Sequence, residues 1–330
     1  MTETALEITD LALSYDNARV VEDFTLSIET GAFVSLLGPS GCGKTTVLRA
    51  IAGFLPVASG TIRLLGEDIT RLPPERRDVG IVFQNYALFP TMTAFENIAF
   101  GLRAARKPHA EIRKAVAEIA EVAGIGAYLD RTPANLSGGQ QQRVAIARAL
   151  VMGTRVLLMD EPLSNLDAKV RQTMRREIKR LQREIGFTAV FVTHDQEEAL
   201  SMSDSIVVLN AGRIEQIGTP RALYKSPATP FIAGFIGSAN ELSPMATQRL
   251  AGVIGARCFV KHEDLFFNED GVPATVLHAE FLGTTTRIDL DLDGCEVAVL
   301  LSDATAPEIG ATVHVALRPG AAHVFEGSAT

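Results

Sequence analysis

The segment from Gly38 to Thr45, GPSGCGKT, is the feature of this 330-residue chain that most restricts its fold. It follows the apolar run AFVSLL, which suits a buried strand, and it precedes TTVLRAIAGFL, which has a helical pattern. The segment fits G-x-x-x-x-G-K-[ST], in which glycines let successive backbone N–H groups point at one phosphate group. The dipole of the following helix strengthens this attraction. The sequence therefore predicts a phosphate-binding loop between a strand and a helix.

Two side chains of this loop have distinct expected roles. We expect Lys44 to reach the β- and γ-phosphates of a nucleotide and the Thr45 hydroxyl to bind Mg²⁺. Cys42 is either a small tolerated residue or a reactive thiol at a helix N-terminus. The predicted nucleotide-binding residues of the loop are Gly38, Pro39, Ser40, Gly41, Cys42, Gly43, Lys44, Thr45 and Thr46.

A second apolar run, residues 156–159, ends in the carboxylates Asp160 and Glu161. At the carboxyl edge of a parallel sheet both would lie in the crevice where a nucleotide binds. Consecutive strand residues point to opposite sides, so the two carboxylates should have different roles. We expect Asp160 to hold Mg²⁺ and Glu161 to accept a proton from, or to orient, the attacking water. Without the phosphate-binding loop, the pair would be an ordinary solvated strand end.

Element pattern and charge divide the chain into two predicted domains. Strands alternating with helices predict a largely parallel sheet covered on both faces, whereas beyond residue 260 short strands between turns predict a small all-β domain. Residues 241–330 hold 5 Lys/Arg and 13 Asp/Glu, and the rest of the chain is neutral. We therefore predict a nucleotide-binding domain at 1–238, with a helical subdomain at about 86–152, and a β domain at 239–330. A neutral body argues against a nucleic-acid surface.

Composition excludes several other classes of protein. Three cysteines do not make a disulfide scaffold, and no apolar run approaches the ~20 residues that cross a bilayer. The acidic start MTETALEITD lacks the pattern of a secretory signal. If the protein works at a membrane, we expect a partner to hold it there.

The segment LSGGQQQR at 136–143 narrows the class further. Together with the phosphate-binding loop and the acidic pair, it resembles the signature of ATP-binding cassette (ABC) ATPases, and the resemblance extends over residues 6–237. It implies an α/β P-loop NTPase fold, with a RecA-like core and a helical subdomain, followed by an OB-like all-β domain. Further positions that match the family pattern are Tyr15, Gln84, Asp167 and His194.

The resemblance implies a head-to-tail homodimer that buries two ATP molecules. Ser137 and Gly139 of one subunit would bind the γ-phosphate held by Lys44 of the other, because a helix start is an anion site. Gly138 and Gln140 belong to the same signature segment. A ligand-driven shift to the closed dimer and its opening on hydrolysis would follow.

The same resemblance assigns roles to the remaining positions. Gln84 would contact Mg²⁺ and the water, His194 would polarise the site beside Glu161, and Asp167 would contact the opposing subunit. Tyr15 would stack on adenine. Alternatives from the residues alone remain open: Tyr15 and His194 can be structural, Gln84 can be a polar strand end, and Asp167 can be a helix cap.

Residues 85–103, NYALFPTMTAFENIAFGLR, resemble the segment that importer ATPases dock against their permease subunits. We expect Tyr86, Leu88 and Phe89 to be exposed there, with internal packing as the alternative. The C-terminal β region resembles the TOBE domains of these importers, although it has Lys261 and His262 where the family often has Arg and Pro. That domain would stabilise the dimer or regulate it.

The expected protein is therefore a peripheral ATPase at the cytoplasmic face of the inner or plasma membrane. It would couple Mg-ATP hydrolysis to solute uptake through a permease that is served by an extracytoplasmic solute-binding protein. The resemblance favours 2-aminoethylphosphonate or iron(III) as the solute, with polyamine, sulfate or thiamine as alternatives. Competing classes are a soluble ABC ATPase of DNA repair or translation, a non-catalytic nucleotide-binding module and an exporter cassette.

Overall fold

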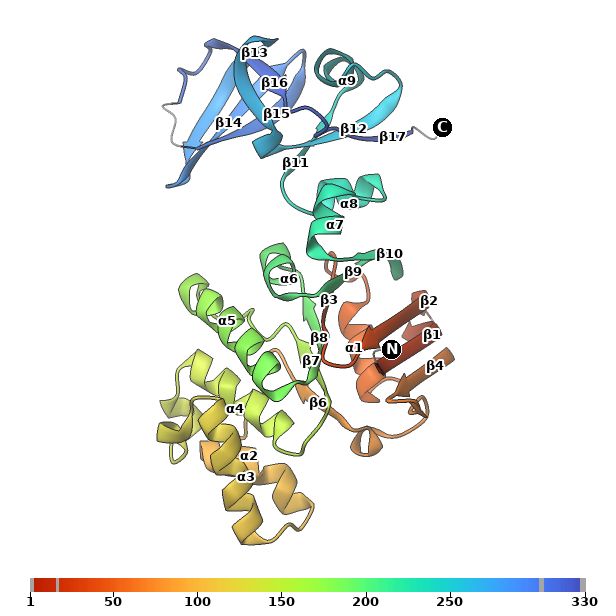
Figure 1. The fold of residues 1–330 in the computed structure, drawn as a ribbon, viewed down its shortest axis with the longest axis vertical. Helices are drawn as coiled ribbons and strands as arrows, with labels where there is room; N and C mark the ends of the chain where they lie inside the picture. The colour runs from red at the N-terminus through yellow and green to blue at the C-terminus, as the bar shows by residue number, and fades with distance from the viewer. Residues whose placement is uncertain (1–2, 16–17, 303–305, 327–330) are drawn as a thin grey trace. The chain divides into compact units, whose positions relative to one another are not determined.

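The computed structural model describes residues 3–15, 18–302 and 306–326, and the chain divides into two compact units, Met1–Pro220 and Arg221–Thr330 (Figure 1). This division lies before the boundary predicted after residue 238. The reason is that helices α7 (Pro220–Lys225) and α8 (Pro230–Phe235) precede strands of the second unit, and α8 packs on them. The buried ammonium of Lys261 on β12 (Ala256–Lys261) donates hydrogen bonds to the carbonyls of Ala233 and Ile236 on α8 and at its end.

A six-stranded sheet forms the centre of the first unit, in the order β10-β9-β3-β8-β7-β6. All neighbouring strands are parallel except the β9–β10 pair, as the alternation of strands and helices predicts. The strands are β3 (Phe33–Leu37), β6 (Val79–Val82), β7 (Val156–Asp160), β8 (Thr188–Thr193), β9 (Ser205–Asn210) and β10 (Arg213–Gly218).

Both faces of this sheet are covered, and alternating residues of one strand enter different cores. Leu158 packs into the cluster that includes α1 (Lys44–Ala52) and an antiparallel sheet, whereas Leu157 packs against α5 (Ala168–Ile185) and α4 (Gly138–Leu150). The antiparallel sheet has the order β2-β1-β4-β5 and consists of β1 (Thr4–Tyr15), β2 (Ala18–Glu29), β4 (Ser59–Leu64) and β5 (Glu67–Asp68). Figure 1 shows α1 between the two sheets.

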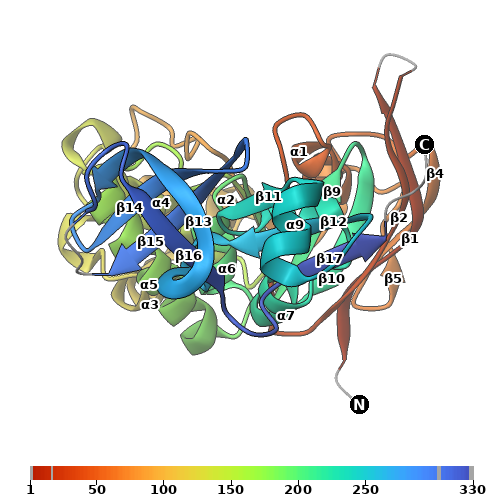
Figure 2. The ribbon, with the colours of Figure 1, turned by 90° about the horizontal axis from the view of Figure 1, so that it is seen from above.

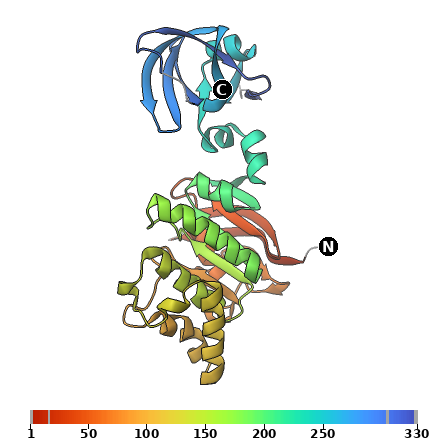
Figure 3. The same cartoon turned by 60° about the vertical axis from the view of Figure 1, so that its left-hand side comes forward.

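Three helices form a lobe beside the sheet (Figure 3): α2 (Ala94–Ala104), α3 (His109–Val122) and α4. Helix α2 begins at a capping box in which Thr93 and Glu96 satisfy each other's backbone N–H groups. Helix α3 has one apolar face, with Ile112 and Val116 buried in the lobe's own core. A short helix, α6 (Gln196–Met202), follows β8.

The second unit is mostly antiparallel sheet, as predicted, with the addition of α9 (Pro244–Ala251). One sheet has the order β11-β12-β17 and the other has the order β15-β14-β13-β16 (Figure 2). The two sheets share one apolar core. Their other strands are β11 (Ala239–Leu242), β13 (Leu265–Phe281), β14 (Thr285–Leu292), β15 (Cys295–Ser302), β16 (Thr312–Leu317) and β17 (His323–Glu326). Within the described ranges, no helix has the length and apolar character that crossing a bilayer requires.

Candidate nucleotide-binding and hydrolysis site

The carboxyl ends of three central strands meet at one edge of the parallel sheet. Leu37 of β3 lies opposite Thr193 of β8, and Val192 lies opposite Asp160 of β7. The phosphate-binding loop, Glu161 and His194 each come directly after one of these ends. Parallel register therefore brings together residues that are about 30 to 150 positions apart in the chain, at the edge where such sheets bind ligands.

The glycines of the loop are required for two different reasons. Gly41 and Gly43 have φ angles of 79° and 103°, in the left-handed region that favours glycine. At Gly38 the reason is space, because a Cβ there would lie 2.2 Å from the Leu209 carbonyl oxygen. The loop is thus held in one curled conformation by backbone demands and by close packing.

Lys44 is buried and is pre-positioned by the loop itself. Its ammonium donates to the carbonyl oxygens of Gly38 at 2.7 Å and Pro39 at 2.8 Å, and it contacts Sγ of Cys42 at 3.7 Å. An ammonium has three N–H donors, and a thiol sulfur is a weak acceptor. Two N–H donors therefore hold the ammonium in place. The third, which faces only a weak sulfur acceptor, can donate to a phosphate oxygen instead without losing a strong hydrogen bond.

Thr45 and Asp160 form an oxygen pair beside this lysine. The Thr45 hydroxyl donates to Oδ1 of Asp160 at 2.8 Å, and the carboxylate is partly buried. Burial raises the pKa of Asp160 above its ordinary value, and the hydrogen bond from Thr45 opposes this rise. Hydroxyl and carboxylate oxygens are the ligands that Mg²⁺ takes beside phosphate, so this pair fits the expected ion.

Glu161 and His194 lie in contact. His194 Nδ1 is 3.2 Å from Oε2 of Glu161, and the histidine side chain is 56% exposed while the glutamate side chain is 23% exposed. Glu161 has a φ of 45°, an uncommon value for a residue with a side chain, and its N–H donates to the Val192 carbonyl at 3.0 Å. A cavity of about 80 Å³ adjoins both residues. The carboxylate is thus fixed on its backbone and reachable from solvent.

The signature segment caps α4 and leaves backbone donors at the helix start. The Ser137 hydroxyl accepts from Gln140 N–H, and the Gln140 side chain accepts from Ser137 N–H at 2.9 Å. In the part of the chain that the structure describes, no hydrogen bond is recorded for the N–H groups of Gly138 and Gly139. Ser137 is exposed, and a cavity of about 410 Å³ adjoins it. The segment is therefore accessible to an anion from another molecule.

Two cations beside the signature segment were missed by the sequence reasoning. Lys169 and Arg143 line the same cavity as Ser137 and Gly139. Lys169 is exposed, and Arg143 pairs with Glu177 at 3.7 Å. Both charges favour an anion at this helix start. They lie on helices whose basic residues otherwise look like an ordinary solvated face, so the sequence offered no specific signal.

The remaining predicted site residues, Gln84, Asp167 and Tyr15, differ in what the structure shows of their side chains. Gln84 is exposed just after β6, and its carbonyl accepts from the Asn165 side chain at 3.0 Å. Asp167 is the N-cap of α5, accepting from Val170 N–H at 2.9 Å, so the capping alternative holds for this side chain. The Tyr15 backbone pairs with Ala18 in the β1–β2 hairpin, but its side chain lies outside the described residues.

The expectation that Tyr86 is exposed is wrong. Only 5% of its surface is accessible, because its ring packs into the core between α4, α5 and the sheet. Leu88 and Phe89 are half-buried, and the Phe89 ring lies 4.5 Å from Phe100, which is 43% exposed. The apolar surface in this region is therefore made by Phe89 and Phe100 without Tyr86.

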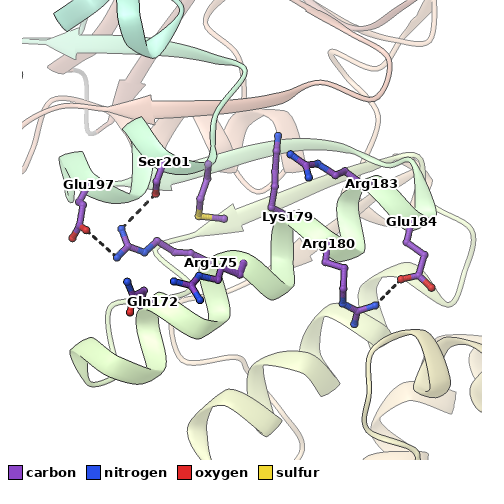
Figure 4. Close-up of a pocket in the computed structure, with 10 residues that line it drawn as sticks. Gln172, Arg175, Lys179, Arg180, Arg183, Glu184, Glu197 and Ser201 are labelled. Atoms are coloured by element: carbon purple, nitrogen blue, oxygen red, sulfur yellow. Dashed lines mark hydrogen bonds and ion pairs between the residues drawn. The ribbon is translucent and has the colours of Figure 1, made fainter.

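Two further cavities lie elsewhere in the first unit, and one of them reaches Thr46 of the predicted nucleotide-binding set. One of about 440 Å³ is lined by Thr46, Arg49, Phe54, Leu55 and Phe83, and Phe54 is 53% exposed. The other, of about 720 Å³, lies along α5 and α6 (Figure 4). In this basic groove, Arg175 pairs with Glu197 and Arg180 pairs with Glu184. The groove contains none of the predicted phosphate or magnesium ligands, so its size does not identify the reaction site.

The fold and the site define a P-loop protein that binds ATP. Residues 21–164 match the protein family described as ABC transporter, and residues 260–325 match the family described as TOBE domain. Similar proteins include the uncharacterized ABC transporter ATP-binding protein y4fO of Sinorhizobium fredii, which is 61% identical over 99% of this chain and 97% of its own length. The spermidine/putrescine import ATP-binding protein PotA of Thermobifida fusca is 44% identical over 98% of this chain and 94% of its own length.

A solved structure is also similar. That structure is cbiO1 from Clostridium perfringens, part of the ABC transporter complex cbiONQ, with a TM-score of 0.63 and 30% identity over 67% of this chain and 90% of the other. The chain therefore belongs to the ATP-binding proteins of ABC transporters and carries a TOBE domain. It is an ATPase coupled to transport, as the signature segment predicted.

Proposed function

We propose that this protein is the ATPase subunit of a binding-protein-dependent importer and that it hydrolyses Mg-ATP at the edge of its parallel sheet. One observation carries the catalytic part of the proposal. His194 lies 3.2 Å from Glu161, at the same edge as Lys44 and the Thr45–Asp160 pair. This set contains a base, a residue that orients the base, and ligands for phosphate and metal.

The roles follow from the contacts of each residue. Lys44 transfers one N–H donor to the phosphates, while the loop N–H groups bind the remaining oxygens. Thr45 and Asp160 would hold Mg²⁺, and the ion when bound offsets negative charge on the phosphates. Glu161 accepts a proton from the attacking water, and His194 orients this carboxylate through Nδ1. Gln84 and Tyr15 are assigned to water and adenine by family resemblance alone.

Two copies of the chain would complete each site. The N–H groups of Gly138 and Gly139 and the Ser137 hydroxyl are accessible donors at a helix start, which is suited to a γ-phosphate. They belong to the helical lobe, whereas Lys44 belongs to the sheet core. A head-to-tail homodimer brings the two donor sets of different subunits to one nucleotide. Asp167 caps α5, whose Lys169 and Val170 line the cavity beside Ser137. We therefore propose an ATP-dependent homodimer.

We propose a polyamine as the solute. This choice rests on relatives named as spermidine/putrescine import ATP-binding proteins, in Thermobifida fusca and Haemophilus influenzae, which are 44% and 51% identical. These relatives give no support for the expected preference for 2-aminoethylphosphonate or iron(III), which become the competing outcomes of the test. An ATPase subunit does not contact the solute, so its own site cannot decide between them.

A permease would hold the protein at the cytoplasmic face of the membrane. Two aromatic pairs, each with one member near Gln84 in the chain, favour this contact. They are Phe89 with Phe100, and Phe54 with Phe83 at 6.1 Å between ring centroids. An exposed aromatic surface of this kind suits an amphipathic helix of a partner. Leu88 remains part of the proposed contact, and Tyr86 does not.

The test is ATP hydrolysis in vesicles that contain the chain, the permease encoded beside it and the matching solute-binding protein. We expect spermidine-loaded binding protein to stimulate hydrolysis. Stimulation by 2-aminoethylphosphonate or iron(III) instead would change the solute and keep the importer. Hydrolysis that no loaded binding protein stimulates would count against an importer and favour another ABC ATPase.

A further inference from the structure

The chain after β6, residues 84–89, is held in an unusual backbone conformation. Tyr86 and Ala87 are consecutive residues with φ angles of 61° and 46°, and neither is glycine. Such conformations persist only where the surroundings over-determine them. The segment also contains Gln84, assigned above to the hydrolysis site, and Leu88 and Phe89, assigned to the permease contact. The contacts that enforce its shape therefore act on a segment that joins the proposed hydrolysis site to the proposed permease contact.

One side chain donates hydrogen bonds to the carbonyls of both residues with positive φ. Arg148, in the last turn of α4, donates from Nη1 to the Ala87 carbonyl at 2.7 Å and from Nη2 to the Tyr86 carbonyl at 2.8 Å. Its guanidinium carbon also lies 5.7 Å from the centroid of the Phe89 ring. The two parallel donors of a guanidinium match two adjacent carbonyls, a geometry that a lysine ammonium does not offer. Burial lowers the pKa of Arg148, yet an arginine stays charged.

The same helix carries the signature segment at its other end. Ser137 is the N-cap of α4, and Arg148 lies in the last turn of this 13-residue helix. A hydrogen-bonded helix of this length behaves as a rod of about 20 Å. The ends of segment 84–89 are tied elsewhere, with Asn165 bonded to the Gln84 carbonyl and Asn97 bonded to Phe89. Arg148 alone among these bonds connects the segment to the helix that presents the signature donors.

We propose that Arg148 is a positioning residue that makes segment 84–89 and the signature end of α4 move together. A displacement of the segment by a permease would then shift the donors at Ser137 relative to the opposing γ-phosphate. A shift of those donors on nucleotide binding would likewise reach the permease contact, because coupling between sites is reciprocal. The proposal rests on the ATP-dependent homodimer proposed above. It adds a specific bond through which the two surfaces communicate.

The experiment compares Arg148→Gln and Arg148→Lys with the wild-type full chain. Coupling residues change such equilibria by about 0.5–2 kcal/mol, so kcat for ATP should fall by about 2- to 30-fold in Arg148→Gln. The Kd for ATP without Mg²⁺ should stay within about twofold, because Lys44 is untouched. Backbone hydrogen exchange at 86–89 should accelerate. Arg148→Lys should fall between wild type and Arg148→Gln in both kcat and exchange, since its ammonium keeps the charge but lacks two parallel donors that match adjacent carbonyls.

The matched control is Arg180→Gln. Arg180 also donates to a backbone carbonyl between elements, that of Val122 at 2.9 Å, and it does not touch segment 84–89. This variant should keep wild-type kcat and wild-type exchange at 86–89. The proposal is overturned if Arg148→Gln keeps both kcat and exchange, or if its kcat loss is matched by Arg180→Gln. If Arg148→Gln does not fold, unchanged kcat and exchange in Arg148→Lys would overturn it.

The outcomes separate this inference from the proposed function. A wild-type chain that does not hydrolyse ATP would refute the hydrolysis site, while exchange at 86–89 would still test the bond to α4. Normal wild-type hydrolysis with unaffected Arg148 variants would refute only the positioning role.

Discussion

Glu161→Gln is the change that most directly tests the hydrolysis site. The amide has nearly the same volume as the carboxylate, and its oxygen can still accept from Nδ1 of His194, now 3.2 Å away. The backbone bond from residue 161 to Val192 does not involve the side chain. Because the loss is confined to proton acceptance, we expect kcat to fall by about 10²- to 10⁴-fold, the usual contribution of a general base. This equals about 2.7–5.4 kcal/mol of transition-state free energy.

The assay measures phosphate release at saturating Mg-ATP together with ATP binding by a fluorescent analogue. ATP affinity should be unchanged, because Lys44 and Thr45 are held by the loop carbonyls and by Asp160. Glu184→Gln is the control, since Glu184 is a half-exposed carboxylate on α5 that pairs with Arg180, and such a pair contributes about 0–1 kcal/mol. A Glu161→Gln protein that keeps most of its turnover would remove Glu161 from the role of base.

A second variant shows whether His194 acts through Glu161. If it does, His194→Ala should reduce kcat strongly in the wild-type background and much less in the Glu161→Gln background, because residues that act as a unit are non-additive. Equal losses in both backgrounds would show that His194 acts on the nucleotide independently.

Two further outcomes are expected. Ser137→Ala and Lys44→Ala should each be inactive. An equal mixture of the two variants should recover about a quarter of wild-type activity, because half of the dimers are mixed and each mixed dimer has one intact site of two. A mixture without activity would contradict the shared site. A chain ending at residue 220 should bind ATP as the full chain does, whereas one ending at residue 240 should aggregate, because Ile232 on α8 loses the cover of β12. Thermal unfolding and ATP titration of both truncations measure this, and loss of ATP binding in the shorter chain would contradict the observed division.

The core of the site could be predicted because it depends on local rules and on strand order. Apolar runs that end in Leu37, Asp160 and Thr193 are strands, and parallel strands align their carboxyl ends. Once the three runs are placed in one parallel sheet, Lys44 and Glu161 must lie at the same edge. The family resemblance then added His194 and Ser137. The structure brings His194 to Glu161 and leaves Ser137 exposed.

What the sequence could not predict depends on packing between distant segments. Tyr86 lies in a segment rich in apolar residues, and nothing local shows which ring turns inward. Its ring packs into a core formed by α4, α5 and the sheet, which are distant in sequence. Helices α7 and α8 have six residues each, too few for a periodic pattern, so the predicted boundary fell after them. Lys261 looked like a departure from the family pattern. Its buried ammonium is in fact what attaches α8 to β12.

Gly138 shows how one residue can satisfy a chemical and a mechanical demand together. Sequence reasoning treats it as an anion-binding glycine at the start of α4. The structure adds a steric reason, because a Cβ at Gly138 would lie 2.8 Å from Cδ2 of Leu166. The Leu166 carbonyl accepts from Arg171, whose guanidinium pairs at 3.1 Å with Asp195, the neighbour of His194. The signature segment and the histidine beside Glu161 are therefore connected within one subunit by tight packing, a hydrogen bond and an ion pair. Because close-packed interiors transmit strain, we expect a displacement of the signature segment to reach the proposed hydrolysis site of the same subunit.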